Sequence, residues 1–373
     1  AVLKNKAWNL FHNRGPHSTV RARRLWDEII DAAWQSGDPG IVFLDQIEKH
    51  NPTPALGRLQ ATNPCGEVPL LPYESCNLGS INLSKMVSEN GSRSVIDWEK
   101  LKSTVQRATR FLDNVIDANH YLDRSMKEMA ASNRKIGLGV MGWADLLIRL
   151  EIPYESREAI MLAERVMRFI NHWSFKTSEA AAVEKGYFPN WKKSVYTPRH
   201  PIRNATRTAI APTGSISIIA NASSSIEPLF ALIYTREDGL GRQMQTEINP
   251  WFMRHLSKTG LLTQALMDDV LSTGRLPESQ AIPKRTRNLF KTSLEISYSH
   301  HIQHQVAFQL HTDNAVSKTI NMPEQTLPDE VGRAFWMAWQ QGLKGITIYR
   351  NGSKKRQVLT AGTESAQLRH LHE

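Results

Sequence analysis

The stretch ATNPCGE at residues 61–67, followed by YESCNLGSINL at residues 73–83, holds both cysteines of the chain. Asn63, Cys65 and Glu67 stand at alternate positions, so in an extended segment their side chains would project from one face. That face would present an amide, a thiol and a carboxylate together. This combination is more typical of a reactive site than of a hydrophobic core.

Pro64 and Gly66 lie between these three residues and shape the backbone. Proline fixes φ and glycine permits unusual φ values, so the two disfavour a helix or a central strand and predict a stiff, tight loop. A plainer interpretation is that Cys65 is a small buried hydrophobic residue, as most free cysteines are, and that Asn63 and Glu67 are ordinary loop residues. Taken alone, the short pattern favours this plainer interpretation.

The composition is that of a globular protein. The 373 residues, 40% of them hydrophobic, suffice to bury one large core or two smaller ones. The sequence has neither the roughly 18 consecutive apolar residues of a membrane span nor the apolar region of a signal peptide at its amino terminus. We therefore expect a cytoplasmic protein that does not enter a membrane.

The chain carries a net charge of +10, which favours anionic partners such as nucleotides or nucleic acid. Nucleic acid is the less favoured of the two, because the basic residues are dispersed apart from short clusters at 199–207 and 354–356. Two cysteines in so long a chain argue against a secreted disulfide framework, and their spacing does not fit a zinc site.

Apolar periodicity predicts helices separated by strands along the whole chain. Helices are expected over residues 21–34, 97–129, 155–185 and 328–342, and strands over residues 41–44, 207–211 and 346–349. This alternation, without an internal repeat, favours an α/β architecture resembling a barrel.

Gly137, Gly139 and Gly142 form a G-x-G-x-x-G pattern, which can mark a dinucleotide-binding loop. Neither an apolar strand before the pattern nor an acidic residue about twenty positions after it is evident. We therefore expect close packing of the backbone where a strand turns into a helix, rather than a nucleotide site.

His300 and His304 have the i, i+4 spacing that a metal site on a helix can use. No third ligand stands out in the sequence. We therefore expect no metal site and predict that these histidines lie on a solvated helix face.

The expected strand over 207–211 runs directly into PTGSIS at residues 212–217. A strand, a glycine turn with hydroxyl residues and a helix start can bind an anion, because free N–H groups and the helix dipole point at the ligand. Ser and Thr also cap most helices, so the residues alone leave simple capping open and slightly favoured.

These motifs, in this order, resemble the catalytic chains of ribonucleotide reductases. N-P-C-G-E with a second cysteine eleven residues on is similar to their finger loop, above all in the adenosylcobalamin-dependent class. The class that takes its radical from an iron-containing partner subunit carries tandem tyrosines near the carboxyl terminus, whereas ITIYRN at residues 346–351 has only Tyr349. The resemblance therefore implies adenosylcobalamin as the cofactor. It covers nearly all residues up to about 359 and includes, besides the stretches already quoted, residues 25–27, 37–43, 223–231 and 305–321.

The implied fold is the ribonucleotide reductase type of α/β barrel. Residues 1–352 would form about the second half of it, with a central finger loop at residues 61–67, and residues 353–373 would form a disordered tail. The amino-terminal half of the enzyme, with the effector-binding region and the cysteine that pairs with Cys76, would be missing. The isolated chain is therefore expected to be inactive.

The resemblance also implies roles for individual residues. Cys65 would carry the thiyl radical that abstracts the 3′ hydrogen of the ribose, Glu67 would be the base on the 3′ hydroxyl, and Asn63 would hold substrate hydroxyls. Cys76 would supply one of two reducing thiols, and Cys65 is expected to be a free thiol rather than its disulfide partner. The substrate diphosphate would lie on the loop Ala211, Pro212, Thr213, Gly214, Ser215, Ile216 and Ser217.

The implied reaction is the reduction of ribonucleotides, with ribonucleoside diphosphates as the expected substrates, to 2′-deoxyribonucleotides for DNA synthesis. The implied partners are a thioredoxin-like or glutaredoxin-like reductant and the missing half of the enzyme, and a homodimer is left open. Three alternatives remain: the large chain of an iron-dependent reductase, a noncatalytic nucleotide-binding fragment, and a basic RNA-binding protein suggested only by the charge.

Overall fold

The computed structural model describes residues 1–12, 15–90, 93–237, 244–354 and 359–362. Helices and strands are mixed along the chain, but the alternation that the apolar periodicity predicted is incomplete, because α5 to α7 and α8 to α11 follow one another without a strand between them. The helices are α1 Ala22–Ser36, α2 Leu44–Lys49, α3 Trp98–Ala118, α4 Arg124–Asn133, α5 Trp143–Arg149, α6 Arg157–Lys185, α7 Gly214–Ile219, α8 Pro250–Thr259, α9 Gln264–Thr273, α10 Lys284–Leu289, α11 Tyr298–Gln309 and α12 Pro328–Gln340.

The strands are short and belong to several small sheets. They are β1 Ala7–His12, β2 Gly15–Arg21, β3 Ile41–Val42, β4 Ala61–Thr62, β5 Pro69–Leu70, β6 Asn77–Asn82, β7 Val87–Asn90, β8 Arg93–Ile96, β9 Ile136–Met141, β10 Ile233–Glu237, β11 Met244–Ile248, β12 Thr319–Met322, β13 Gly345–Arg350 and β14 Leu359–Ala361.

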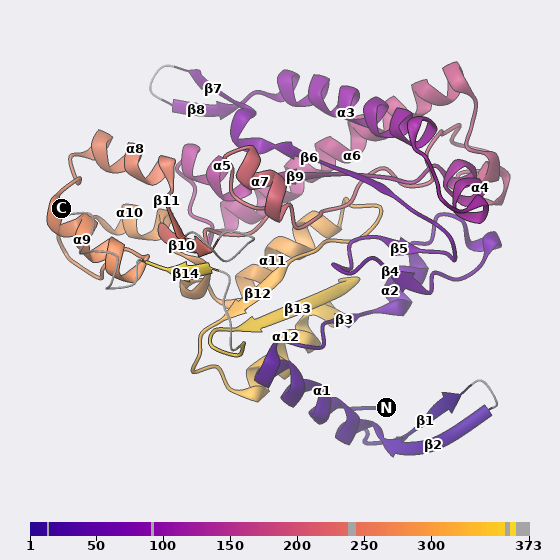
Figure 1. The fold of residues 1–373 in the computed structure, drawn as a ribbon, viewed down its shortest axis with the longest axis horizontal. Coiled ribbons are helices and arrows are strands. Elements are labelled where there is room, and N and C mark those ends of the chain that lie inside the picture. The colour runs from indigo at the N-terminus through magenta and orange to yellow at the C-terminus, as the bar shows by residue number, and fades with distance from the viewer. Residues whose placement is uncertain (13–14, 91–92, 238–243, 355–358, 363–373) are drawn as a thin grey trace.

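Parallel strands form the centre of the molecule. β6 pairs with β9, and β12 pairs with β13, both in parallel. Single parallel bridges join Leu138 to Thr208 and Ile210 to Val316, so an extended segment lies between these two pairs. The strand expected over 207–211 is therefore present only as an extended segment with two bridges. Figure 1 shows α3 and α6 beside β6 and β9, with β12 and β13 further down the view.

Two apolar clusters account for most of the core around these strands. In the larger cluster, Leu101 of α3, Val166 of α6 and Phe308 of α11 pack with β9, in which Ile136 and Val140 are fully buried. A second cluster joins α1 and α12 to β12 and β13. A third, around α8, α9 and α10, lies at the end of the molecule opposite the β1–β2 hairpin (Figure 1).

The glycine pattern at Gly137, Gly139 and Gly142 serves backbone packing, as predicted, because it forms β9 and the turn into α5. A Cβ atom on Gly139 would lie 2.2 Å from the carbonyl oxygen of Ala209, and one on Gly137 would lie 2.6 Å from Leu78 Cδ2. Only glycine permits this approach between neighbouring backbones. Gly137 and Gly139 lie within the apolar strand β9, so the strand does not precede the glycine pattern but contains it.

The single helix predicted over 97–129 is wrong. α3 ends at Ala118, where Asn119 takes an extended conformation, and α4 begins at Arg124. The carboxylate of Asp123 accepts a hydrogen bond from Met126 N at 3.1 Å and so caps the second helix. The predicted helices 21–34, 155–185 and 328–342 correspond to α1, α6 and α12.

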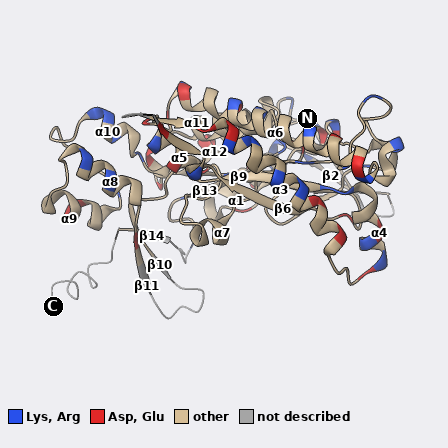
Figure 2. Ribbon diagram, turned by 90° about the horizontal axis from the view of Figure 1, so that it is seen from above, with Lys and Arg blue, Asp and Glu red and all other residues tan. Residues whose placement is uncertain are grey.

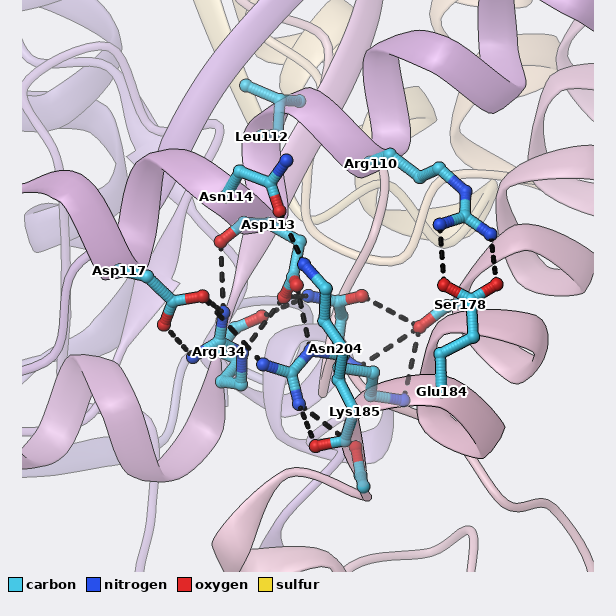
Figure 3. A network of polar contacts seen from close by, with 12 residues as sticks. Arg110, Leu112, Asp113, Asn114, Asp117, Arg134, Ser178, Glu184, Lys185 and Asn204 are labelled. Atoms are coloured by element: carbon cyan, nitrogen blue, oxygen red, sulfur yellow. Dashed lines mark hydrogen bonds and ion pairs between the residues drawn. The ribbon is translucent and has the colours of Figure 1, made fainter.

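A buried polar network fixes the chain just before β9 (Figure 3). The two carboxylate oxygens of Asp113 on α3 accept hydrogen bonds from Arg134 Nε at 2.9 Å and Arg203 Nε at 2.8 Å. Asn204 Nδ2 also donates to Asp113, at 2.9 Å. Arg134 itself takes a left-handed conformation at the end of α4, with φ 48°. The network therefore joins α3, α4 and the loop at 203–204.

The tail predicted to be disordered from residue 353 departs from that expectation in one place. Leu359–Ala361 form β14, which pairs antiparallel with β10. The edge of β10 supplies the backbone partners, since Gly362 N donates to Ile233 O at 2.9 Å. The predicted tail at 355–358 and 363–373 lies outside the described residues. Within the described part of the chain, every helix is too short or too polar to span a membrane.

Candidate active site

The finger loop is a small antiparallel hairpin. β4 and β5 pair through Ala61 with Leu70 and Thr62 with Pro69, and residues 63–68 connect them. Gly66, with φ 80°, closes a turn by donating its N–H to Asn63 O at 3.0 Å. The tight loop predicted from the glycine and proline is therefore present. The extended segment with one shared face is wrong, because the backbone turns between residues 63 and 66.

Asn63 holds this turn together with its side chain. Its Oδ1 atom accepts a hydrogen bond from Val68 N at 3.0 Å, and its own N–H donates to Val68 O at 3.3 Å. The loop is also docked on the centre of the molecule, since Ala315 N donates to Glu67 O at 2.8 Å. Ile210 N donates in turn to Ala315 O at 3.1 Å.

Cys65 lies exposed at the tip of the turn as a free thiol, whereas Glu67 is only 1% exposed. Partial burial and the Glu67 carboxylate raise the pKa of the Cys65 thiol, which therefore stays protonated at neutral pH. The Oε2 atom of Glu67 is buried and has no hydrogen-bond partner among the described residues. A buried carboxylate oxygen without a partner is ready to accept a proton or a hydrogen bond from a bound molecule.

Cys76 is also a free thiol, half-buried immediately before β6. A Cβ atom on Gly137 would lie 3.3 Å from its Sγ atom, so the glycine of β9 leaves room for the thiol. Burial raises the pKa of Cys76 to about 12, with Lys135 acting to lower it and Glu74 and Glu67 acting to raise it. Glu67 thus acts on both thiols.

The loop at 212–217 has the predicted strand-to-helix form. Thr213 takes a left-handed conformation, with φ 57°, before the short helix α7. Its hydroxyl accepts from Ser225 N at 2.8 Å and does not cap the helix. The first N–H groups of a helix have no partner inside it, and Gly214 and Ser215 are exposed. The side chain of Thr213 therefore leaves these donors available, which disagrees with the capping interpretation.

Residues 223–231 and 305–321, two stretches on which the family resemblance depends, come together through Glu227. Its carboxylate accepts from Thr319 N at 2.8 Å and pairs with the buried ammonium of Lys318. A cavity of about 310 Å³ lies at this contact, and its lining includes Ser217, Ser224, Glu227 and Thr319.

The histidine prediction is wrong for His304, because α11 packs between α6 and β12 and turns this side chain inward, whereas His300 stays partly exposed. His301 and His304 are fully buried. The ring nitrogen Nε2 of His304 lies 2.9 Å from Tyr154 O, and burial lowers the pKa of His304 to about 3. Among the described residues, no group of side chains is arranged to bind a metal ion.

One pair of charged residues beside the cysteines is not predicted from the sequence. Lys135 Nζ lies 2.6 Å from Glu74 Oε2, and both side chains are almost completely buried. The sequence does indicate that each residue lies near the cysteines, because Glu74 precedes Cys76 by two residues and Lys135 directly precedes β9. The contact itself joins residues 61 positions apart and has no local pattern.

Comparison with known proteins agrees with this geometry. Residues 5–200 and 197–349 match the family model described as the ribonucleotide reductase barrel domain. The vitamin B12-dependent ribonucleoside-diphosphate reductase of Thermoplasma acidophilum is 50% identical over 345 residues, which are 92% of this chain and 44% of that protein. The protein of the same name from Mycobacterium tuberculosis (strain CDC 1551 / Oshkosh) is 45% identical over 97% of this chain and 52% of its own length.

A solved structure gives the same result. The class Id ribonucleotide reductase alpha subunit of Actinobacillus ureae matches with a TM-score of 0.75 and 25% identity, over 88% of this chain and 61% of that one. The chain thus spans about half the length of the curated relatives it matches. The resemblance inferred from the finger loop is confirmed: the chain belongs to the ribonucleotide reductase barrel-domain family.

Proposed function

We propose that this chain is part of the catalytic chain of an enzyme that reduces ribonucleotides to 2′-deoxyribonucleotides by a thiyl radical mechanism. Its substrates would be ribonucleoside diphosphates. One observation carries the proposal: a protonated, exposed thiol at Cys65 stands two residues from a buried Glu67 whose Oε2 atom has no partner among the described residues. The names of the relatives, ribonucleoside-diphosphate reductases, support the substrate class.

Each residue of the turn has a distinct task in this mechanism. Cys65, as the thiyl radical, removes the 3′ hydrogen atom of the ribose, and Glu67 Oε2 accepts the proton of the 3′ hydroxyl. Asn63 uses one lone pair of its Oδ1 atom to close the turn, and its amide N–H groups hold substrate hydroxyls. The rigid hairpin keeps these three groups at fixed positions while the substrate reacts.

Cys76 acts as a reducing thiol. Its raised pKa keeps it protonated, so it can transfer hydrogen to the substrate rather than react as a thiolate. The sequence contains only two cysteines, so the other thiol of the reducing pair would come from outside these 373 residues. A thioredoxin-like or glutaredoxin-like protein would restore the resulting disulfide.

Residues 211–217 bind the substrate diphosphate in this proposal. The backbone N–H groups at the start of α7 donate to phosphate oxygens, and Thr213, held by Ser225, fixes the turn before them. Ala211 and Pro212 connect this turn to the bridged segment that carries Ile210. Because Ile210 also contacts Ala315, on which the finger loop is docked, the phosphate loop and the reactive turn are supported by the same central segment.

Adenosylcobalamin, when bound, supplies the radical chemistry that converts the Cys65 thiol to a thiyl radical. The thiol fits this requirement in two ways, because it is exposed at a loop tip and protonated, and therefore holds a hydrogen atom to lose. Tyr349 on β13 is preceded by the buried Ile348, so the tandem tyrosines typical of the iron-dependent alternative are absent at this position.

The test uses the full-length enzyme that contains this sequence, with a nucleoside diphosphate, a dithiol reductant and adenosylcobalamin. We expect deoxynucleotide formation that depends on the cofactor and is abolished in Cys65→Ser, because serine keeps the shape but forms no accessible radical. Nucleotide affinity should stay within about threefold, since the hydroxyl preserves local packing. Substantial activity in Cys65→Ser would overturn the mechanism, and binding without turnover in the wild type would favour a noncatalytic nucleotide-binding protein.

A further inference from the structure

The buried pair Lys135 and Glu74 contacts both segments that carry the cysteines. The ammonium of Lys135 donates to Glu74 Oε2 at 2.6 Å and to Pro69 O at 3.2 Å. Pro69 belongs to β5, one strand of the hairpin that bears Cys65. Glu74 lies two residues before Cys76. One ammonium therefore links the finger loop to the turn that carries the second thiol.

The carboxylate of Glu74 organises that turn. Its Oε2 atom also accepts from Leu71 N at 2.8 Å, and its Oε1 atom accepts from Asn133 Nδ2 at 2.7 Å. Tyr73, inside the same turn, has φ 63°, a conformation that the surrounding contacts must maintain. Lys135 directly precedes β9, which pairs in register with the strand that follows Cys76.

Stability alone does not explain this pair. Removing two charges from water costs several kcal/mol per ion in a protein, and well-packed apolar residues often serve equally well or better. The position of the pair suggests another reason, because Lys135, Glu74 and Glu67 are the charged groups that act on the Cys76 thiol. The Lys135 ammonium acts to lower the pKa of the thiol, whereas the two carboxylates act to raise it.

We propose that Lys135 and Glu74 act together as a positioning pair, which holds the Cys76 turn against the finger-loop hairpin and balances the charge around the Cys76 thiol. The catalytic consequence rests on the proposed function. The charge balance at Cys76 depends on the charged groups that lie near its thiol and not on turnover, so it can be tested separately.

The test measures alkylation of Cys76 by iodoacetamide at neutral pH in the full-length enzyme, with peptide mass spectrometry to separate it from other cysteines. Alkylation below the pKa reports the thiolate fraction. Glu74→Gln keeps the shape of the side chain and removes a negative charge, so Cys76 should react at least about threefold faster. Lys135→Met removes the strongest cation, so Cys76 should react at least about threefold more slowly.

The decisive result is that Glu74→Gln and Lys135→Met change the alkylation rate of Cys76 in opposite directions. If the pair were only a structural support, breaking it from either side would loosen the turn and change the rate in the same direction. Lys135→Arg keeps the charge and should stay within about twofold of the wild type. Asp117→Asn is the matched control, because Asp117 pairs with Arg134 beside Lys135 but does not act on Cys76. It should leave the rate unchanged.

The alkylation rate of Cys76 measured in urea is the rate for an unfolded chain. A variant that reacts at this rate without urea has lost its fold. If Lys135→Met is such a variant, the comparison of Glu74→Gln with Lys135→Arg decides, and equal rates in those two would overturn the proposal. Rates that change in the same direction, or not at all, would also overturn it. In turnover assays both charge-removing variants should lower kcat with KM within about twofold, since the substrate contacts remain. An inactive wild type would contradict the proposed function without affecting the alkylation result.

Discussion

Cys65 and Glu67 stand two positions apart but lie in opposite environments. The turn exposes the thiol, whereas it buries the carboxylate beside the central segment. This division suits a reaction in which the thiol meets a reactive species and the carboxylate meets only the substrate. It depends on Gly66, whose positive φ allows the chain to reverse between the two residues.

Cys76→Ser should separate the first step of the reaction from its completion. Serine cannot act as a reductant, but Cys65 and Glu67 are untouched, so removal of the 3′ hydrogen should continue. We expect exchange of a labelled 3′ hydrogen in the full-length enzyme together with the loss of repeated turnover. Sustained multiple turnovers in Cys76→Ser, or a Cys65–Cys76 disulfide in the active enzyme, would contradict these roles.

Gly214→Pro should weaken binding of the substrate diphosphate. Gly214 is the first residue of α7, where proline is tolerated in a helix, so the variant loses one N–H donor; it also strains the preceding Thr213, whose ψ of 23° proline disfavours, and circular dichroism of the variant checks that the fold survives. A hydrogen bond to a charged group contributes about 1.5 kcal/mol, which corresponds to roughly a tenfold loss of affinity. Titration calorimetry with a nucleoside diphosphate measures this change.

The matched variant for that experiment is Gly214→Ala. A Cβ atom at this position meets nothing within 4 Å, and alanine keeps the N–H group. Its affinity should therefore stay within about twofold of the wild type. If both variants bind equally well, the backbone at residue 214 does not hold the phosphate.

At the scale of elements, Asp113 determines how α3 is held to the start of β9. Although burial acts to raise it, hydrogen bonds from Arg134 and Arg203 keep the pKa of Asp113 below its usual range. A lowered pKa in the folded state stabilises the fold above the unfolded pKa of about 3.9, and this stabilisation is lost as pH falls through the folded value. The network in Figure 3 is therefore expected to weaken in acid.

Asp113→Asn should lower the free energy of unfolding by about 3 kcal/mol at neutral pH, because two buried guanidinium groups lose their shared carboxylate. The difference in Tm between the wild type and this variant should begin to shrink as pH falls below about 4, where the carboxyl of the unfolded chain becomes protonated, and should disappear once pH passes the lower pKa of the folded state. Thermal unfolding between neutral and acidic pH measures both effects. A difference that grows in acid would contradict the assigned charge state.

The elements also show what could be predicted from sequence. Periodic apolar residues located α1, α6 and α12, because each of these helices buries one face against the core. The break between α3 and α4 was missed because neither glycine nor proline marks residues 119–123. The polarity of its segment predicts a solvated face for His304, because the packing of α11 against α6 has no signal in the local sequence. In that packing the backbone carbonyl of Tyr154 partners the Nε2 atom of the ring, while its buried Nδ1 atom has no partner among the described residues.

At the scale of the molecule, the candidate site is assembled from segments distant in sequence. The finger loop is docked on Ala315, the loop at 211–217 follows Ile210, and backbone hydrogen bonds connect the two. The sequence identified each motif, largely through family resemblance. The contacts between them depend on the parallel order of the central segments, which no local pattern determines.

The charge of the whole molecule distinguishes the remaining RNA-binding alternative. The net charge is +10, but Figure 2 shows segments with Lys and Arg interspersed with segments with Asp and Glu. Scattered phosphate contacts release counterions, so RNA affinity should fall at least tenfold between about 50 and 200 mM salt. A nucleoside diphosphate held by backbone N–H groups should lose much less affinity over the same range.

Parallel titrations with a nucleoside diphosphate and a homopolymer RNA measure the difference. Tight RNA binding that persists at the higher salt concentration, with weak nucleotide binding, would contradict the preference for a nucleotide over nucleic acid as the anionic partner.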